Sequence, residues 1–360
     1  MQLTMRPAIV PRPLVILLAV ALLAAALAGA LLLAGSQNRL RPFGLASNGA
    51  IIVDVDARLW RANADGSNPQ VLEIGLGRAF SPVFSPDGTK VAFLSQAAER
   101  TPMSVFVANT DGSGARNVTG DMAVVAGPLD SVAWSPDGTR LVFSSSDDGR
   151  LSLYVVGADG TGLAALTGAD GSRRFPRWSP DGQWLAYQLK PSAVPGGTHL
   201  AISRPDGSDE RRLQSVEDGN ASFAAPQWSA DSKRIAFFRK EGYAHVVGIT
   251  DLDGTEEIVS VPGEDAVNPA WSPDDAHLLY TLANGAMVII NGDTPANRVT
   301  IPAGVAGCGA SWSPDATVIL GLGETCTQLF RIPVDDPAST TPIDIPEGPI
   351  NIAAWQRTAP

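Results

Sequence analysis

The sequence predicts an all-β protein, a β-propeller of four-stranded blades that is preceded by one transmembrane helix. Three observations predict it: a motif of the type aromatic-Ser-Pro-Asp-Gly recurs, its period is close to that of propeller blades, and a long apolar run precedes the first repeat. With 360 residues, 44% of them hydrophobic and 18% charged, the chain can bury a large core.

The apolar run covers residues 14–35 without interruption, and its 22 residues suffice to cross a bilayer core of roughly 30 Å. We therefore predict a short cytoplasmic N-terminus at 1–13, a transmembrane signal anchor at 14–35 and a linker at 36–45. A cleaved signal peptide is the alternative, although its apolar region usually has only about 7 to 15 residues. Two arginines precede the run and two follow it, so charge alone leaves its orientation open.

The aromatic residue of the motif marks the period of the repeat. It stands at Phe84, Trp134, Trp178, Trp228, Trp271, Trp312 and, without the rest of the motif, Trp355. The steps are 50, 44, 50, 43, 41 and 43 residues, which is the spacing of β-propeller blades.

One unit shows the plan of a blade. "SVAW" at 131–134 is a first strand, "SPDG" is a type I turn with Pro at its second position, and "TRLVFSS" is a second strand. "RLSLYVV" follows as a third strand, and a second Asp-Gly turn leads to the short fourth strand "LAALT". Each unit therefore predicts a four-stranded antiparallel sheet.

The two ends of the repeat region complete each other. Residues 50–73 contain second, third and fourth strands but lack the aromatic first strand, which is present at 350–356. Six complete units and this split one predict seven blades over residues 46–357, closed by the C-terminal strand, which hides the sheet edges. A six-bladed ring is the alternative if one weak unit does not form.

The stretches "WSPDGTRLVFSS" and "ADGTGLAALT" resemble the repeats of TolB-like β-propellers, which are related in pattern to WD-repeat proteins. The resemblance covers residues 46–357. This family includes periplasmic scaffolds, sensor domains, ligand binders, lyases and the non-catalytic lids of serine peptidases, so the resemblance implies a fold and leaves the function open.

The aspartate of the motif is predicted to be structural. A catalytic residue is needed once or twice, whereas a turn is needed in every blade, and Asp side chains bond nearby backbone N–H groups in such turns. These aspartates are Asp87, Asp137, Asp181, Asp231, Asp274 and Asp315.

Strand direction divides the ring into two faces. Both turn types lie on one of them, the turn face, and the irregular loops between second and third strands and between blades lie on the other, the irregular face. Variable loops on a rigid scaffold are the usual place for binding, so we assign binding to the irregular face. The residues expected to rim the channel there are Arg78, Phe80, Asp130, Arg173, Arg174, Phe223, Asp265, Asn268 and Asn351. A solvated rim whose charges satisfy one another is the alternative.

The two cysteines, Cys308 and Cys326, are expected near the irregular face within one blade. From this placement we predict a disulfide, with two buried thiols as the alternative. A disulfide requires an oxidising compartment and would place the propeller on the extracytoplasmic side of the membrane.

Enzymatic motifs are missing. The sequence has no G-x-S-x-G elbow, no H-E-x-x-H, no phosphate loop and no cysteine set with zinc spacing, so we predict neither catalysis, nor a cofactor, nor a metal. The alternative is a hydrolase or lyase that acts on glycans through carboxylates at the channel mouth, namely Asp130, Glu264 and Asp265.

The partner class follows from charge and resemblance. A net charge of -11 and a pI near 4.7 disfavour nucleic acid. The sequence predicts a membrane-anchored, extracytoplasmic propeller that binds a protein, peptide or cell-envelope polymer, as a scaffold or sensor in the cell envelope.

Overall fold

The computed structural model describes residues 44–96, 102–125, 132–146, 150–166, 171–192, 197–216, 223–292, 294–346 and 348–358. The described residues belong to one compact unit, which spans 41–360. In the described part no helix combines the length and apolarity needed to cross a membrane. The predicted anchor at 14–35 lies outside the described residues.

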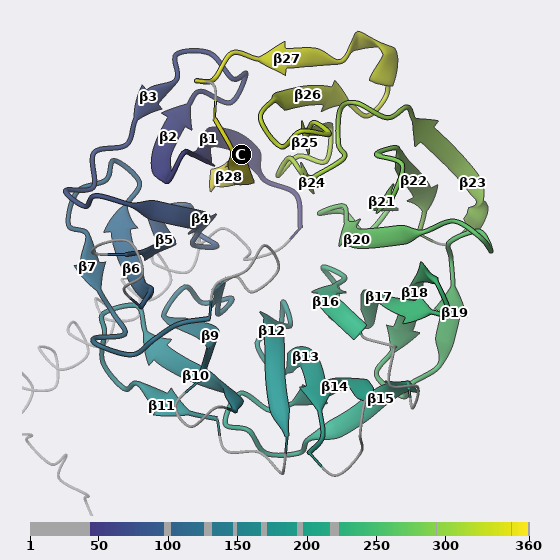
Figure 1. Cartoon of the computed structure of the whole chain (residues 1–360), viewed down its shortest axis with the longest axis horizontal. Coiled ribbons are helices and arrows are strands. Elements are labelled where there is room, and N and C mark those ends of the chain that lie inside the picture. Colours follow the sequence, from purple (N-terminus) through teal and green to yellow (C-terminus); the bar gives the residue numbers. More distant parts are fainter. Residues whose placement is uncertain are drawn as a thin grey trace, which may run out of the picture. The chain divides into compact units, whose positions relative to one another are not determined.

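Residues 44–358 form seven antiparallel four-stranded sheets arranged as the blades of a ring, with the first strand of each blade nearest the centre (Figure 1). The innermost strands are β28 (Ile350–Thr358), β4 (Ala79–Phe84), β8 (Ala133–Trp134), β12 (Ser172–Trp178), β16 (Phe223–Trp228), β20 (Ala266–Trp271) and β24 (Gly309–Trp312). The second strands are β1 (Ser47–Val55), β5 (Lys90–Ser95), β9 (Arg140–Ser146), β13 (Leu185–Lys190), β17 (Arg234–Glu241), β21 (His277–Leu282) and β25 (Val318–Leu322).

The outer half of each blade follows in chain order. The third strands are β2 (Arg58–Ala62), β6 (Ser104–Asn109), β10 (Leu151–Gly157), β14 (Thr198–Ser203), β18 (Ala244–Asp251), β22 (Met287–Asn291) and β26 (Leu329–Pro333). The outermost strands are β3 (Gln70–Val71), β7 (Arg116–Asn117), β11 (Ala164–Ala165), β15 (Arg211–Val216), β19 (Glu256–Ile258), β23 (Thr294–Ile301) and β27 (Thr341–Ile343), and a short 3-10 helix, η1 (Pro337–Ser339), precedes β27. We number the blades from blade 1 (β28 with β1–β3) to blade 7 (β24–β27).

The predicted seven blades and their closure by the C-terminal strand are confirmed, and the six-bladed alternative is wrong. Blade 1 joins the two ends of the chain, since β28 pairs antiparallel with β1 from Ser47↔Thr358 to Val55↔Ile350. This pairing completes the four-stranded sheet of blade 1.

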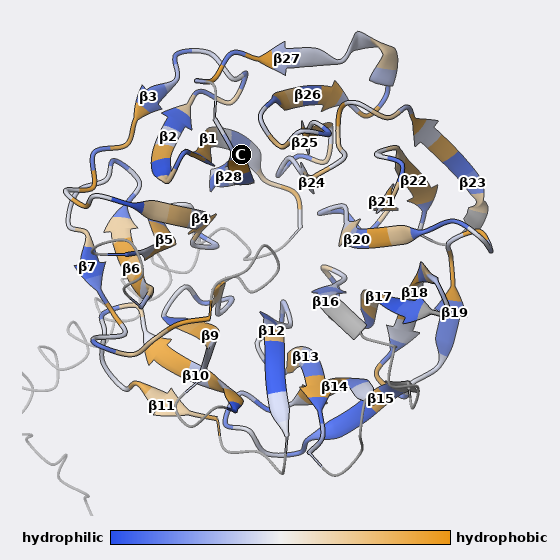
Figure 2. Ribbon diagram, viewed as in Figure 1, coloured by the Kyte–Doolittle hydropathy of each residue, from blue (hydrophilic) through white to orange (hydrophobic). Residues whose placement is uncertain are grey.

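The core lies between the blades. Seven apolar clusters each join two neighbouring blades, for example Leu59 of blade 1 with Phe93 of blade 2. Figure 2 shows apolar residues along third strands such as β6 and β10, whereas the outer strands β7 and β15 are mostly hydrophilic. Each blade is therefore stabilised by its neighbours, and only a closed ring covers all the apolar faces.

In five of the seven blades the tryptophan of the motif contacts the preceding blade in one of two ways. The indole N–H of Trp134, Trp228 and Trp312 donates to a backbone carbonyl of the preceding blade at 3.0–3.2 Å. In blades 4 and 6 an arginine of the preceding blade stacks instead, Arg140 on Trp178 and Arg234 on Trp271. The tryptophan is thus an interface residue between blades.

Candidate functional site

The turns of the turn face are fixed by repeated hydrogen bonds. In blade 3 the Ser135 hydroxyl donates to Asp137 Oδ1 at 2.6 Å, and the Thr139 N–H donates to the same oxygen at 3.0 Å. The same two bonds recur at Asp87, Asp181, Asp231, Asp274 and Asp315. These aspartates therefore fix the turns, which agrees with a structural role.

Three of the turns have a side chain where the others have glycine, in the left-handed region. Ser232, Asp275 and Ala316 have φ of 64°, 60° and 61°, a conformation that costs non-glycine residues energy. Two of them bond the neighbouring turn in return: Ser232 accepts from the Asp181 N–H, and the carboxylate of Asp275 accepts from the Ala230 and Asp231 N–H groups. These bonds between blades offset part of the strain.

Both ends of the propeller lie on the turn face. The Ala46 N–H donates to the carbonyl of Pro314, which belongs to the turn of blade 7, and Arg357 Nη2 donates to the Gly44 carbonyl at 2.8 Å. The strand β28 also ends on this face, because β1 begins there and the two are antiparallel. The irregular face consequently carries neither end of the described chain.

On the irregular side the inner strands are bulged. In β4, β12 and β20 the register shifts at the residue before a proline, and Ser81, Phe175 and Asn268 there have φ of 50°, 56° and 54°. A bulge bends the strand and redirects the side chain. Phe175 illustrates this, since it is buried in the cluster between blades 5 and 6 although it belongs to blade 4.

Arg173 was predicted to rim the channel, and the structure corrects this. This side chain is not on the channel rim but buried, with 5% of its surface exposed. It forms an ion pair with Glu210 at 2.8 Å, and the same carboxylate oxygen accepts from the Tyr187 hydroxyl at 2.7 Å. The reason is that side chains of an inner strand alternate toward the two sheet faces, which pack on neighbouring blades, so only the strand edge faces the channel.

The other predicted rim residues that the structure describes make separate contacts. Arg78 and Arg174 are half-buried and lie over the rings of Phe80 and Phe175, at 5.5 and 4.8 Å from the centroids. Asn268 is half-buried at its bulge, Phe223 begins β16, and Asp130 lies outside the described residues.

Asp265 is paired with a histidine. Its Oδ1 accepts from the His245 N–H at 2.8 Å and lies 2.7 Å from His245 Nδ1. Partial burial opposes ionisation of Asp265, but the bonds and charge from His245 outweigh it and lower the pKa of that carboxyl. Glu264 is likewise bound, by Arg298 at 2.7 Å. A general acid needs a raised pKa, so Asp265 does not fit that part of the glycan-cleavage alternative.

Asn351, the last predicted rim residue, bonds a carboxylate that sequence reasoning missed. Asp54 of β1 is 0% exposed and accepts from the Asn351 N–H at 2.9 Å, from Asn351 Nδ2 at 3.1 Å and from the Ser81 N–H at 3.0 Å. Asp54 thus links the closing strand to blade 2. The sequence signal for Asp54 is an aspartate between two valines at the end of an apolar run.

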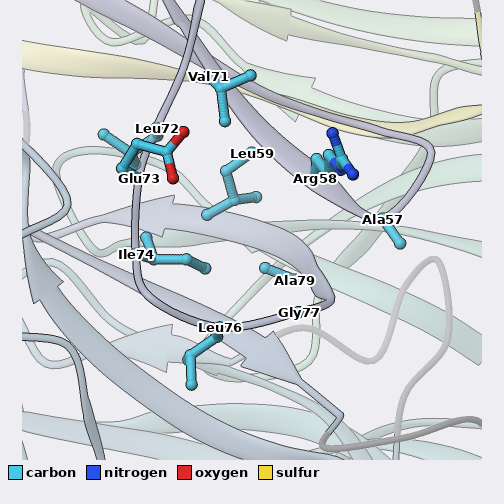
Figure 3. A pocket seen from close by; sticks show the side chains of 10 residues that line it. All are labelled: Ala57, Arg58, Leu59, Val71, Leu72, Glu73, Ile74, Leu76, Gly77 and Ala79. Atoms are coloured by element: carbon cyan, nitrogen blue, oxygen red, sulfur yellow. The ribbon is translucent and has the colours of Figure 1, made fainter.

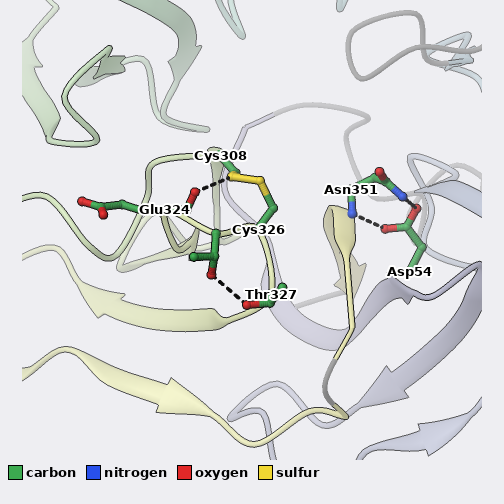
Figure 4. Close-up of a disulfide and its surroundings, with 7 residues drawn as sticks. Asp54, Cys308, Glu324, Cys326, Thr327 and Asn351 are labelled. Carbon is green, nitrogen blue, oxygen red and sulfur yellow. Dashed lines mark hydrogen bonds between the residues drawn. A yellow bond between two sulfur atoms is a disulfide. The ribbon is translucent and has the colours of Figure 1, made fainter.

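The cysteines lie on the other side of the closing strand. Cys308 and Cys326 form a disulfide with Cα atoms 5.5 Å apart, and the Cys326 carbonyl accepts from the Ile350 N–H at 2.7 Å. Figure 4 shows the disulfide beside the start of β28 and the Asp54–Asn351 contact opposite it. The first two residues of the closing strand are therefore fixed from both sides.

Two hollows on the irregular face flank the connection from β3 to β4. The first, of about 280 Å³, lies between this connection and blade 1 and is floored by Leu59, Leu72 and Ala79 (Figure 3). The second, of about 500 Å³, lies between the same connection and blade 2. Both are lined by Leu76 and Gly77, so a single chain segment separates them. Sequence reasoning missed this site, whose only signal was an isolated leucine between two glycines.

A second exposed feature of this face is the hairpin of β17 and β18. These strands have eight residues each, and the hairpin ends at Gly242 and Tyr243. Tyr243 is fully exposed, at 104% of its reference area. An exposed tyrosine presents a large contact area at low entropic cost.

Comparison with known proteins agrees with this architecture. Residues 53–196 match the family described as TolB beta propeller domain. The Tol-Pal system protein TolB of Gluconobacter oxydans is 29% identical over 269 residues, which cover 60% of this chain and 56% of that protein. The chain therefore spans little more than half the length of this relative.

Solved structures show the same fold. TolB from Acinetobacter baumannii is similar with a TM-score of 0.54 at 19% identity, over 86% of this chain and 66% of that one. The tricorn protease is similar with a TM-score of 0.60 at 12% identity, over 85% of this chain and 34% of that one. The fold alone is thus shared by a peptidase. The repeated motif, the seven blades and the match over residues 53–196 together make the chain similar to TolB-like β-propeller proteins.

Proposed function

We propose that this protein is a membrane-anchored, extracytoplasmic β-propeller that binds a protein, peptide or envelope polymer through its irregular face, as a scaffold or sensor in the cell envelope. One observation carries the proposal. The turn face consists of internally bonded turns, carries both ends of the propeller and has an open hollow of about 520 Å³ beside Arg140 and Asp159, whereas the irregular face has two adjoining hollows, the unpaired connection between them and an exposed tyrosine.

The disulfide supports the compartment, because disulfides form and persist in oxidising environments. The apolar residues 14–35 supply the anchor, since they are long enough to span a bilayer. Similarity to a Tol-Pal system protein supports a role in the cell envelope. Binding, rather than catalysis, is supported by the engaged state of both carboxylates, since Glu264 pairs with Arg298 and Asp265 accepts hydrogen bonds from His245.

In-cell photo-crosslinking tests the proposal. A photoreactive amino acid is placed at Tyr243 or Arg58 on the irregular face and at Lys233 or Gly162 on the turn face, all of which are exposed. Adducts are then identified by mass spectrometry. We expect the irregular-face sites to yield the same protein or polymer adduct and the turn-face sites to yield none. Equal adducts from both faces, or adducts from the turn face alone, would contradict the proposal.

A further inference from the structure

The segment Glu73–Gly77, here called the ridge, is a connection whose backbone is left unpaired. In the described part of the chain the hydrogen bonds stop at Leu72, whose N–H donates to Leu59, and resume at Ala79, whose N–H donates to Ala57. Between them no backbone N–H or carbonyl of the ridge has a hydrogen-bond partner there, and all its residues except Ile74 are exposed. Five consecutive residues thus offer donors and acceptors to another chain.

Gly77 has no internal reason to be glycine. Its φ is not in the left-handed region, and a Cβ built there would meet no atom within 4 Å. Gly75 and Gly120 nearby also have open space, but their φ values of 70° and 60° explain them. A glycine that neither the turn geometry nor the packing requires permits the close approach of another backbone.

The first hollow fits an apolar side chain between charges. Its floor is formed by Leu59 and Ala79, which are both 1% exposed. Figure 3 shows Leu59 between Glu73 on one side and Arg58 on the other. Exposed charges of both signs beside an apolar floor suit a peptide, which carries its own alternating polarity, better than they suit a uniformly charged ligand.

The second hollow fits a cation. Among the lining residues that the structure describes, Asp121 is the single charged one, and it is exposed. The ring of Phe106 lines the same hollow. Asn117 is held in place, because its Nδ2 donates to the Gly120 carbonyl at 2.8 Å and its Oδ1 accepts from the Thr119 N–H at 2.9 Å. A carboxylate and an aromatic ring together attract a lysine or arginine side chain.

We propose that the ridge and its two hollows bind an extended peptide segment of a partner protein, with an apolar residue in the first hollow and, two positions along, a lysine or arginine in the second. Side chains two residues apart on an extended chain lie on the same side, roughly 7 Å apart. That span carries them across a ridge one chain thick, about 5 Å. This inference rests on the proposed function and names the chemistry of its partner.

Peptide probes test it with the full chain in detergent micelles. The probes are capped heptapeptides with photoreactive leucine at the third position, Lys at the fifth, and pooled Ser, Thr, Gly or Asn elsewhere. We expect adducts within residues 57–79. Gly77→Val, which fits without an internal clash, should lower the yield at least tenfold, whereas Ala303→Val, which adds bulk to the exposed connection between blades 6 and 7, should leave it unchanged.

Charge reversal gives the second readout. Asp121→Lys should weaken the Lys probe at least tenfold and favour an otherwise identical Glu probe, and Asp335→Lys, the same change on the exposed edge of blade 7, should do neither. Adducts elsewhere, yields insensitive to both Gly77→Val and Asp121→Lys, or no adducts at all would overturn the proposal. If in-cell adducts from Tyr243 persist in that case, the binding function stands and only this site is wrong.

Discussion

The two faces of the propeller differ in whether their contacts repeat from blade to blade. On the turn face, six blades fix their first turn with the same serine and aspartate bonds. On the irregular face, the special contacts occur once each: the disulfide, the Asp54 network and the unpaired ridge. Repetition therefore marks what every blade needs to fold, and single occurrence marks closure or binding.

The closing strand shows the contrast within one element. At its turn-face end, Gln356 Nε2 donates to the Gly88 carbonyl and Arg357 to the Gly44 carbonyl. At its irregular end, Ile350 is held by Cys326 and Asn351 by Asp54. The irregular end thus depends on the disulfide and the Asp54 contacts, which recur in no other blade of the described chain. Removing them tests closure of the ring separately from folding of the blades.

The largest effect is expected from the disulfide. Cys308→Ser with Cys326→Ser opens a loop with a sequence separation of 18, which should lower the free energy of unfolding by about 3 kcal/mol in the chain-entropy account. Urea unfolding of the full chain in detergent measures this. The oxidised native chain is the reference, and reductant should destabilise it to the level of the variant. A variant as stable as the oxidised chain would show that the Ile350 contact does not need the bond.

Asp54→Asn should have the next largest effect. The amide keeps one acceptor oxygen but turns its NH₂ toward a buried N–H donor, so about 2 kcal/mol of unfolding free energy should be lost. The matched control is Asp274→Asn on the turn face, where one oxygen accepts both bonds and an amide oxygen can replace it. Equal losses in the two variants would remove the distinction between closure and repeated turn.

The fold was predictable because a propeller repeats its information. The tryptophans, the Asp-Gly turns and the split first blade each occur at readable spacing, and the two cysteines fall in one blade by strand order. The site was less predictable, because strand order does not tell which way an inner side chain points. The side chain of Arg173 points to Glu210 and not to the channel. Phe175 packs between blades 5 and 6 because of a bulge, for which the following proline is the only sequence signal.

The hollows could not be derived from the sequence for a related reason. They arise where the connection after β3 crosses between blades 1 and 2, and their walls come from residues 57 to 121. Such a shape depends on how far the outer strand continues, and β3 has only two paired residues. Loop composition alone does not determine that length, so the sequence does not distinguish the ridge from an ordinary connection.

The smallest effect for each residue is a dependence on pH, which we expect from aspartates of the turn face. Burial opposes ionisation of Asp137 and Asp315, but bonds from the preceding serine and the following threonine outweigh it and lower the pKa of both carboxyls. In acid the unfolded chain then binds more protons than the folded one, so stability is complete above the unfolded pKa near 4 and is lost as pH falls through the folded pKa. With Asp137→Asn and Asp315→Asn together, the urea midpoint should therefore decrease less between about pH 6 and about pH 3, which lie about 2 units above and about 1 unit below that pKa. Asp335→Asn, outside these turns, should leave the fall unchanged. If the double variant kept the full pH dependence, acid sensitivity would have to originate in other carboxylates, such as Asp87 and Asp231, whose pKa values are also lowered.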